Sequence, residues 1–312
     1  MKIFNKFPVE KKYKGSAIAI GNFDGMHRGH QKVFKQGKKF AKKNKIKFGV
    51  LTFTPLPVMF FNKKINNYKL VLEDQKFKLF KKYGVDFTVN IKFNKSFSKI
   101  SAEKFIKNII YKNIEPKLIF VSNNFKFGHK RKGNVNLLKK FGKKNNYKLL
   151  KISPFKYENK IISSTRIRKS LQNGKLDFAN KLLSRTWFID GKVEEGKKLG
   201  RKLGFRTCNI NVKDYVLPKN GIYAVKILIS NTKKIYNGAA YLGSRPTFGG
   251  KKILLEINIF SLKKNLYKKK LRVYFLKYLR RDKKFKNSAK LIDQMNKDLI
   301  LVKKGLKTKL VL

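Results

Sequence analysis

The feature that most constrains the fold is a change in the spacing of apolar residues near the middle of the chain. In the first half, short apolar runs alternate with stretches of helical length, whereas in the second half apolar runs are separated by turns bearing Gly or Pro. Strands that alternate with helices indicate a parallel sheet, and strands in close succession indicate an antiparallel sheet or barrel. The sequence therefore predicts two domains of different class.

The first half predicts an α/β, Rossmann-like domain with a parallel sheet over residues 1–185. Its expected strands are 16–20, 47–53, 86–91, 118–121 and 148–152, and its expected helices are 29–44, 73–83, 101–113, 134–144, 164–172 and 175–183. Ligands of such sheets bind at the carboxyl ends of the strands. The loops that follow these strands are therefore the first places to look for a site.

The second half predicts a small antiparallel β-barrel domain over residues 186–312. Expected strands cover 187–193, 221–230, 234–242, 253–260 and 270–278, and a C-terminal helix is expected at 288–303. The boundary between the two domains is placed near residues 184–186.

The composition is strongly basic, with 78 Lys and Arg against 17 Asp and Glu and a formal net charge of +61. The lysines are spread along the whole chain, which is typical of a genome biased toward A·T-rich codons and of solvated protein faces. We therefore expect no specific nucleic-acid partner, although the positive field would attract anionic ligands such as ATP.

Other global features indicate a cytoplasmic protein. No run of about twenty apolar residues is present to span a bilayer, and the N-terminus lacks the apolar segment of a signal peptide. The single cysteine, Cys208, cannot form an intramolecular disulfide and is expected to be a small buried side chain. The sequence leaves the oligomeric state open.

The loop at residues 21–30, called the phosphate loop below, reads GNFDGMHRGH and leads from the first expected strand into a helix. Backbone N–H groups and the helix dipole bind anions at such a place, and the glycines of the loop let a phosphate approach closely. His27 and His30, three residues apart, are expected to donate to phosphate oxygens from one side of the helix. A zinc site would need a third ligand, and the only other histidine is His129.

Four motifs of the first half resemble, in order, those of the bacterial bifunctional riboflavin kinase and FAD synthetase family. They are the phosphate loop, which is similar to the His-x-Gly-His signature of nucleotidyltransferases, TFTPLP at 52–57, NNFKFG at 123–128 and ISSTRIR at 162–168. The resemblance implies that the FMN phosphate attacks the α-phosphorus of ATP, giving FAD and pyrophosphate. It implies catalytic roles for His27, His30 and Arg166.

The same resemblance implies a set of nucleotide-binding residues in the first half. Asp24 either orients the loop or approaches a metal, and Ser164 and Thr165 also suit a helix N-cap. The expected binding residues are Gly21, Phe23, Asp24, Gly25, Gly29, Asn124, Phe125, Ser163, Ser164, Thr165 and Arg168.

The second half resembles riboflavin kinase over residues 191–209, 221–224, 242–249 and 255–258. The resemblance implies that a glycine-rich turn covers ATP phosphates and that Thr207 and Asn209 hold Mg²⁺, because neutral oxygens two apart in a strand share a face. Glu256 is the expected general base for the ribityl hydroxyl of riboflavin. The remaining expected contacts are Gly191, Gly196, Gly200, Gly204 and Arg245.

The chain departs from the pattern of the family at several positions. Leu56 stands where many relatives have His, Asn123 replaces an acidic residue, and Arg206 and Cys208 replace Pro and Ala. We expect a bifunctional enzyme that makes FMN from riboflavin and then FAD, using ATP and Mg²⁺. The alternatives are a chain with one inactive half, an adenylyltransferase for another phosphorylated acceptor, and a non-catalytic basic protein that binds nucleic acid.

Overall fold

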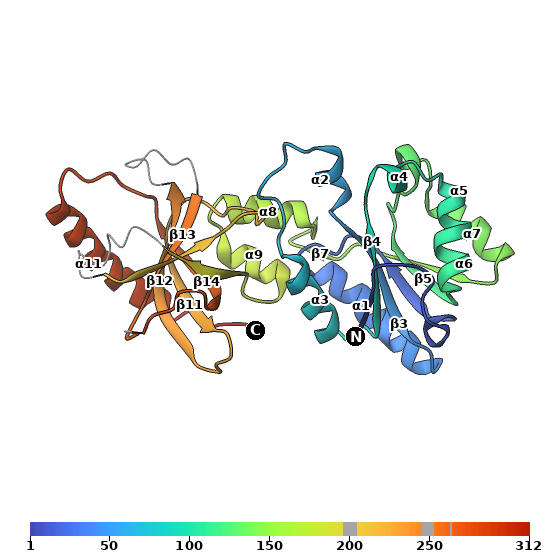
Figure 1. The fold of residues 1–312 in the computed structure, drawn as a ribbon, viewed down its shortest axis with the longest axis horizontal. Helices are drawn as coiled ribbons and strands as arrows, with labels where there is room; N and C mark the ends of the chain where they lie inside the picture. The colour runs from blue at the N-terminus through green and yellow to red at the C-terminus, as the bar shows by residue number, and fades with distance from the viewer. Residues whose placement is uncertain (196–204, 245–252, 263) are drawn as a thin grey trace. The chain divides into compact units, whose positions relative to one another are not determined.

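The computed structural model describes residues 1–312 except 196–204, 245–252 and 263 (Figure 1). The described residues form two compact units. The first unit consists of Met1–Asn66 and Val71–Ser163, and the second consists of Asn67–Leu70 and Ser164–Leu312. Each unit is considered by itself below.

The first unit is built on a parallel sheet of six strands in the order β1-β4-β3-β2-β5-β6. The five predicted strands are confirmed within one or two residues, and β1 adds an edge strand that the sequence did not indicate. The strands are β1 (Lys2–Phe4), β2 (Ala17–Ile20), β3 (Phe48–Thr54), β4 (Phe87–Lys92), β5 (Leu118–Ser122) and β6 (Lys148–Ile152).

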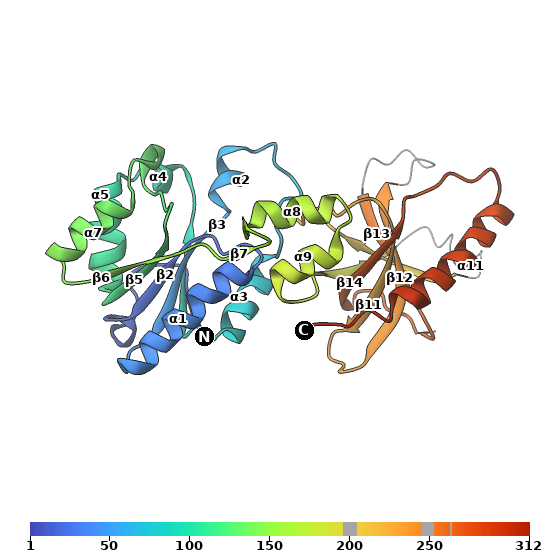
Figure 2. The same ribbon diagram turned by 180° about the vertical axis from the view of Figure 1, so that it is seen from behind.

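Helices cover both faces of this sheet (Figure 1 and Figure 2). One face carries α1 (Arg28–Lys43) and α3 (Glu73–Lys82), whose Phe34 and Phe80 pack into one apolar core. The other face carries residues 102–114 and α7 (Val135–Lys144), whose Phe105 and Leu138 pack into a second core. The sheet is therefore buried on both sides, which explains its apolar strands.

The predicted helix at 101–113 is present but changes its winding along its length. It consists of α5 (Ala102–Lys104), a π-helical stretch η2 (Phe105–Tyr111) and α6 (Lys112–Ile114). Ser101 begins it, because its side chain accepts a hydrogen bond from the Lys104 N–H at 3.1 Å. Shorter elements, α2 (Pro57–Phe61), α4 (Lys95–Ser98) and the hairpin β7 (Lys156–Tyr157) and β8 (Lys160–Ile161), occupy connections.

The second unit is a closed antiparallel barrel of six strands in the order β10-β13-β12-β11-β14-β9, preceded by two helices and followed by one. This confirms the predicted fold class. β10 was not among the predicted strands, although Thr207 and Asn209 were expected to lie in extended chain. The elements are α8 (Ser164–Gln172), α9 (Leu176–Leu183), β9 (Phe188–Glu194), β10 (Thr207–Asn211), β11 (Gly221–Ile229), β12 (Ile235–Ser244), β13 (Ile253–Ile259), β14 (Lys270–Arg280) and α11 (Ser288–Gly305).

Two parts of the chain outside the predicted barrel domain belong to the second unit. Helices α8 and α9 group with the barrel, and so does the short segment 67–70. Lys69 forms a parallel bridge with Tyr215, and its carbonyl accepts from the Val216 N–H at 2.8 Å. The indole Nε1 of the fully buried Trp187 donates to the Leu70 carbonyl at 2.9 Å. The segment 67–70 is thus tied to the barrel by backbone and side-chain bonds.

Helix α11 is joined to the barrel by a bidentate ion pair. The Arg280 Nε lies 2.6 Å from Asp298 Oδ1, and its Nη2 lies 2.5 Å from Asp298 Oδ2. Within the described part of the chain, every helix is too short or too polar to cross a membrane.

Candidate active sites

The phosphate loop, residues 21–30, connects the carboxyl end of β2 to the first turn of α1. Its backbone is left-handed at three positions, with φ of 48° at Phe23, 79° at Gly25 and 43° at Met26. Residues with a side chain adopt this conformation only at an energetic cost. The two non-glycine positions therefore require that surrounding groups hold the turn in place.

Hydrogen bonds from distant parts of the first unit hold this turn. The Gly21 N–H donates to the Leu51 carbonyl at 3.0 Å, and the Thr52 hydroxyl donates to the Asn22 carbonyl at 3.3 Å. The buried carboxylate of Asp24, which is 4% exposed, accepts from the Val71 N–H at 3.4 Å. Through this contact Asp24 helps to hold the turn, which is one of the two roles that the sequence left open for it.

The structure brings His27 and His30 together at the beginning of α1. Their rings are stacked, with centroids 3.6 Å apart and an interplanar angle of 21°. A side chain at Gly29 would place its Cβ 3.1 Å from His27 Cε1, so glycine leaves room for this pair. Two imidazoles beside a helix N-terminus form a set of donors for an anionic ligand.

Phe23 and Arg28 use their side chains for packing. The Phe23 ring is buried and meets the rings of His30 at 5.2 Å and of Phe34 at 5.0 Å. The Arg28 guanidinium lies 4.7 Å from the centroid of Phe155. The Phe23 ring is therefore occupied by packing, which leaves only its backbone for the predicted nucleotide contact.

The loop after β5 lies at the same carboxyl edge of the sheet. Asn124 is exposed, and Phe125 is stacked on Phe127 with centroids 5.4 Å apart. Gly128 has a φ of 73°, and a Cβ there would lie 2.6 Å from the backbone of Ala102. The loop is thus closely packed while Asn124 remains accessible to a ligand.

The predicted motif at 162–168 is divided between the units. Ser163 ends the first unit, whereas Ser164, Thr165, Arg166 and Arg168 begin the second on α8. Arg166 lies over the ring of Phe178, 4.8 Å from its centroid. Arg168 is buried, and its Nε donates to the Tyr68 carbonyl at 2.8 Å. Arg168 therefore anchors the segment 67–70 to α8.

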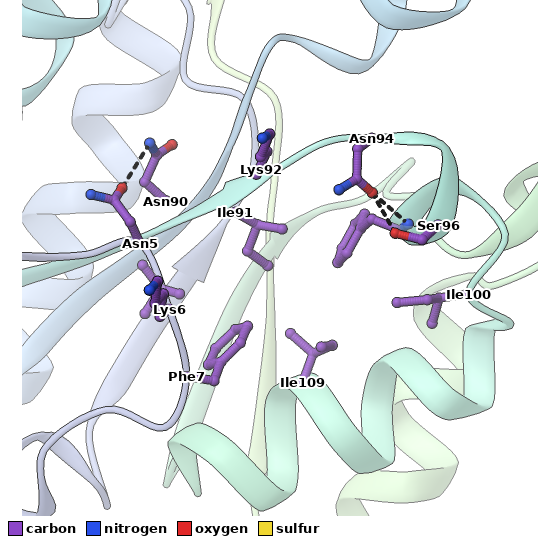
Figure 3. A pocket seen from close by; sticks show the side chains of 12 residues that line it. Asn5, Lys6, Phe7, Asn90, Ile91, Lys92, Asn94, Ser96, Ile100 and Ile109 are labelled. Atoms are coloured by element: carbon purple, nitrogen blue, oxygen red, sulfur yellow. Dashed lines mark hydrogen bonds between the residues drawn. The ribbon is translucent and has the colours of Figure 1, made fainter.

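A pocket of about 370 Å³ lies at the carboxyl ends of β1 and β4 (Figure 3). Its walls combine apolar and amide side chains, with two lysines. The Asn90 Nδ2 donates to Asn5 Oδ1 at 3.3 Å, and Asn90 Oδ1 accepts from the Thr54 hydroxyl at 2.9 Å. The lining residues are Asn5, Lys6, Phe7, Val89, Asn90, Ile91, Lys92, Asn94, Ser96, Phe97, Ile100 and Ile109.

In the second unit, the register of three strands gathers polar side chains on one side of the barrel wall. Asn209 pairs with Glu194 of β9 and with Glu256 of β13, while Thr207 pairs with Asn258. Directly opposed residues of an antiparallel ladder share a face. Ile210 and Leu255, both fully buried, occupy the opposite face. We call the set Glu194, Thr207, Asn209, Glu256 and Asn258 the kinase face.

The kinase face fits a hard divalent cation. Thr207 and Asn209 supply neutral oxygens two residues apart, and the 8%-exposed Glu256 lies directly across from Asn209. The Asn209 Oδ1 is buried and has no hydrogen-bond partner among the described residues. Oxygen donors of this kind are the ligands that Mg²⁺ prefers in combination with phosphate and water.

The remaining residues of the second half have structural roles in the barrel or lie outside the described residues. Gly191 is required by the barrel, because a Cβ there would lie 2.0 Å from Ile210 Cγ2. Cys208 is half-buried, its Sγ donates to the Ile257 carbonyl at 3.5 Å, and burial raises the pKa of its thiol to about 12. Outside the described residues lie Gly196, Gly200, Gly204 and Arg245.

The zinc alternative for the histidines finds no support in the geometry. His129 is exposed, and its Nδ1 lies 3.1 Å from the Ser98 carbonyl. In the part of the chain that the structure describes, no three His, Cys, Asp or Glu side chains are grouped to hold a metal.

Sequence reasoning missed three residues that surround the sites. Thr52 was quoted only as part of a motif, Lys76 carried no signal among the many lysines, and Glu194 was read as part of a turn. Each is recognised by contacts or strand pairing with residues that are distant in the sequence. Asn209 and Glu256, separated by 47 positions, were both predicted because each lies in a motif, and the structure places them directly opposite each other.

Both halves of the chain match known protein families. Residues 9–166 match the family described as FAD synthetase, and residues 183–306 match the family described as riboflavin kinase. A crystal structure described as a macrolide-efflux protein from Streptococcus pneumoniae has a TM-score of 0.83 and 26% identity, covering 97% of this chain and 99% of that chain. That description applies to that protein; the likeness of fold extends over both halves of this chain.

Several curated relatives share one name and are similar to this chain over nearly their full length. A bifunctional riboflavin kinase/FMN adenylyltransferase of Buchnera aphidicola from Schizaphis graminum is 43% identical, over 95% of this chain and 96% of that protein. Proteins of the same name from Haemophilus influenzae and Escherichia coli K12 are 35% and 30% identical, each over more than nine-tenths of both chains. The chain therefore belongs to the bifunctional riboflavin kinase/FMN adenylyltransferase family.

Proposed function

We propose that the chain phosphorylates riboflavin to FMN in its second unit and adenylylates FMN to FAD in its first unit, with ATP as the donor in both steps. The observation that carries this proposal is the presence of a separate polar constellation in each unit. The phosphate loop joins stacked histidines to a helix N-terminus, and the kinase face pairs a buried carboxylate with neutral oxygen donors.

In the adenylyl transfer, the first unit binds and polarises the phosphates of ATP. His27 and His30 donate hydrogen bonds to phosphate oxygens, together with backbone N–H groups at the beginning of α1. Charge that moves toward the leaving pyrophosphate is stabilised by these fixed donors. Attack by an FMN phosphate oxygen requires positioning but no covalent enzyme intermediate, which suits a loop that offers no nucleophile.

The pocket beside β1 and β4 is the proposed seat of the flavin ring system. Its volume of about 370 Å³ lies in the range of roughly 300 to 1,000 Å³ that is usual for small-molecule sites. Phe7, Phe97 and Ile91 offer apolar surface for a planar aromatic ring. Asn90 Oδ1, which accepts one hydrogen bond from Thr54, can accept a second from the polar edge of that ring. The pocket and the phosphate loop both lie at the carboxyl edge of the sheet, where ligands of parallel sheets bind.

In the kinase step, Glu256 accepts the proton of the ribityl hydroxyl as that oxygen attacks the γ-phosphorus of ATP. The burial of Glu256 and its place opposite Asn209 support this role. Thr207 and Asn209 would hold Mg²⁺, which neutralises phosphate charge when it is bound. A cytoplasmic location belongs to the same proposal, because both steps consume ATP.

Incubation with riboflavin, ATP and Mg²⁺, followed by chromatography of the flavins, tests the proposal. FMN should form first and FAD afterward, and FMN supplied directly should yield FAD with release of pyrophosphate. FMN without FAD would show an inactive first unit, and the absence of both products would refute the proposal.

A further inference from the structure

A buried lysine lies in the first unit, close to the phosphate loop. Lys76 belongs to α3 and is only 5% exposed. It is the single buried lysine among those that the structure describes, in a chain with 78 lysines and arginines. Burying an ammonium group costs free energy, so a buried lysine at one particular place needs a local cause.

The contacts of Lys76 lead directly to the phosphate loop. Its Nζ donates to the Thr52 Oγ1 at 3.3 Å, and the same hydroxyl donates to the Asn22 carbonyl at 3.3 Å. The Thr52 side chain is fully buried on β3. A threonine hydroxyl has a single proton, so accepting from Lys76 leaves that proton directed at Asn22. The ammonium therefore fixes the direction of the bond that holds the loop.

The strained part of the loop begins at the residue after Asn22. Phe23, Gly25 and Met26 have left-handed backbone, and such a turn persists only when neighbouring groups hold it. The bond from Thr52 reaches the loop from β3, at the residue just before the left-handed turn. Its loss would allow the turn, and with it His27 and His30, to relax from the arrangement seen here.

We propose that Lys76 is a positioning residue of the adenylyl-transfer site, acting on the phosphate loop through Thr52. A second effect follows from its charge, because a buried ammonium two hydrogen bonds from the loop favours the binding of anionic phosphates there. A methionine would fill the same space without the cost of desolvating a charge, so packing alone does not account for a lysine. The proposal rests on the adenylyltransferase function proposed above.

Replacing Lys76 by methionine tests this role, with Lys78→Met as the matched control. Lys78 is exposed on the same helix, so its replacement removes an equal charge without touching Thr52. We expect Lys76→Met to lower kcat for FAD formation by roughly 10- to 100-fold, since small misplacements of reacting groups have effects of this size. FMN formation by the same molecules should stay within about twofold, which shows that the second unit is unaffected, and an unchanged far-UV circular dichroism spectrum should show that the first unit is folded.

Variants of Thr52 distinguish an effect carried by the Thr52 hydroxyl from a general loss of packing around Lys76. Thr52→Ser keeps the hydroxyl and should retain most of the activity, whereas Thr52→Val keeps the shape and should lower kcat for FAD formation. The double variant Lys76→Met with Thr52→Val should be no slower than Lys76→Met alone, because both changes remove the same hydrogen-bonded path.

Three results would overturn the inference. They are an unchanged kcat for FAD formation in Lys76→Met, equal loss in Thr52→Ser and Thr52→Val, or fully additive losses in the double variant. If Lys76→Met does not fold, the two Thr52 variants decide the question. A wild-type protein that makes no FAD at all would instead refute the proposed function, so the two failures are distinguishable.

Discussion

The phosphate loop and the kinase face position their polar side chains in different ways. In the loop, the turn at Phe23 to Met26 has an unfavourable backbone and depends on bonds from β3 and from Val71. On the kinase face, Asn209 and Glu256 are placed by the alternation and pairing of ordinary strands. A site on a loop is therefore sensitive to its distant anchors, and a site on a sheet is sensitive to its register.

The largest expected effect tests the kinase face alone. Glu256→Gln keeps the shape of the side chain but removes the proton acceptor, and general-base catalysis typically contributes about 10²- to 10⁴-fold. FMN formation should fall by that factor, measured as the initial rate with riboflavin and ATP. FAD formation from supplied FMN should be unchanged, and a parallel loss of both activities would contradict the separation into two sites.

The next effect tests the phosphate loop. His30→Ala removes a side chain that is proposed to donate a hydrogen bond to a phosphate oxygen. FAD formation should fall by roughly 10²- to 10³-fold, the usual effect of deleting one transition-state hydrogen bond. FMN formation should continue at the wild-type rate in the same preparation. Retention of full FAD synthesis would show that neither a hydrogen bond from His30 nor its stacking on His27 is needed for adenylyl transfer.

A smaller effect tests whether strand pairing places the proposed metal ligands. Asn209→Ala should raise the Mg²⁺ concentration needed for half-maximal FMN formation by about tenfold or more. Asn211→Ala is the control, since Asn211 lies two residues further along β10 and pairs with Leu254 rather than with a carboxylate. Equal shifts in both variants would mean that register does not select the ligand.

The smallest effect concerns Cys208, which lies between Thr207 and Asn209. Burial raises the pKa of its thiol to about 12, so that at pH 8 only about one molecule in ten thousand carries the reactive thiolate. The folded protein should react very slowly with a thiol reagent at pH 8 and retain FMN formation. Reaction should accelerate as the pH rises toward 12, and the denatured chain should react at once. Rapid modification of the native protein at pH 8 would contradict the burial.

Local pattern predicted most of the elements, and it failed where an element depends on its neighbours. Residues 207–211 contain one strongly apolar side chain, Ile210, yet they form β10 because β9 and β13 lie on both sides. The helix at 101–113 was predicted from its length and spacing, but these do not distinguish π from α winding over Phe105–Tyr111.

The same limit applies to individual site residues. His27 and His30 were predicted as a pair because they are three positions apart at the beginning of one helix. The anchoring role of Arg168 could not be predicted, because its partner Tyr68 lies 100 residues away. Lys76 was equally hidden, because only its burial distinguishes it from the lysines at the surface.

The segment 67–70 has a consequence for the order in which the protein is made. The ribosome adds Lys69 long before Asp214, which is its ion-pair partner and lies 145 positions later in the chain. At about 5 to 20 residues per second, this interval lasts roughly 7 to 30 seconds. During synthesis, the segment 67–70 therefore remains without its barrel partners for this interval. Folding of the second unit is complete only when the barrel packs against a segment translated in the first quarter of the chain.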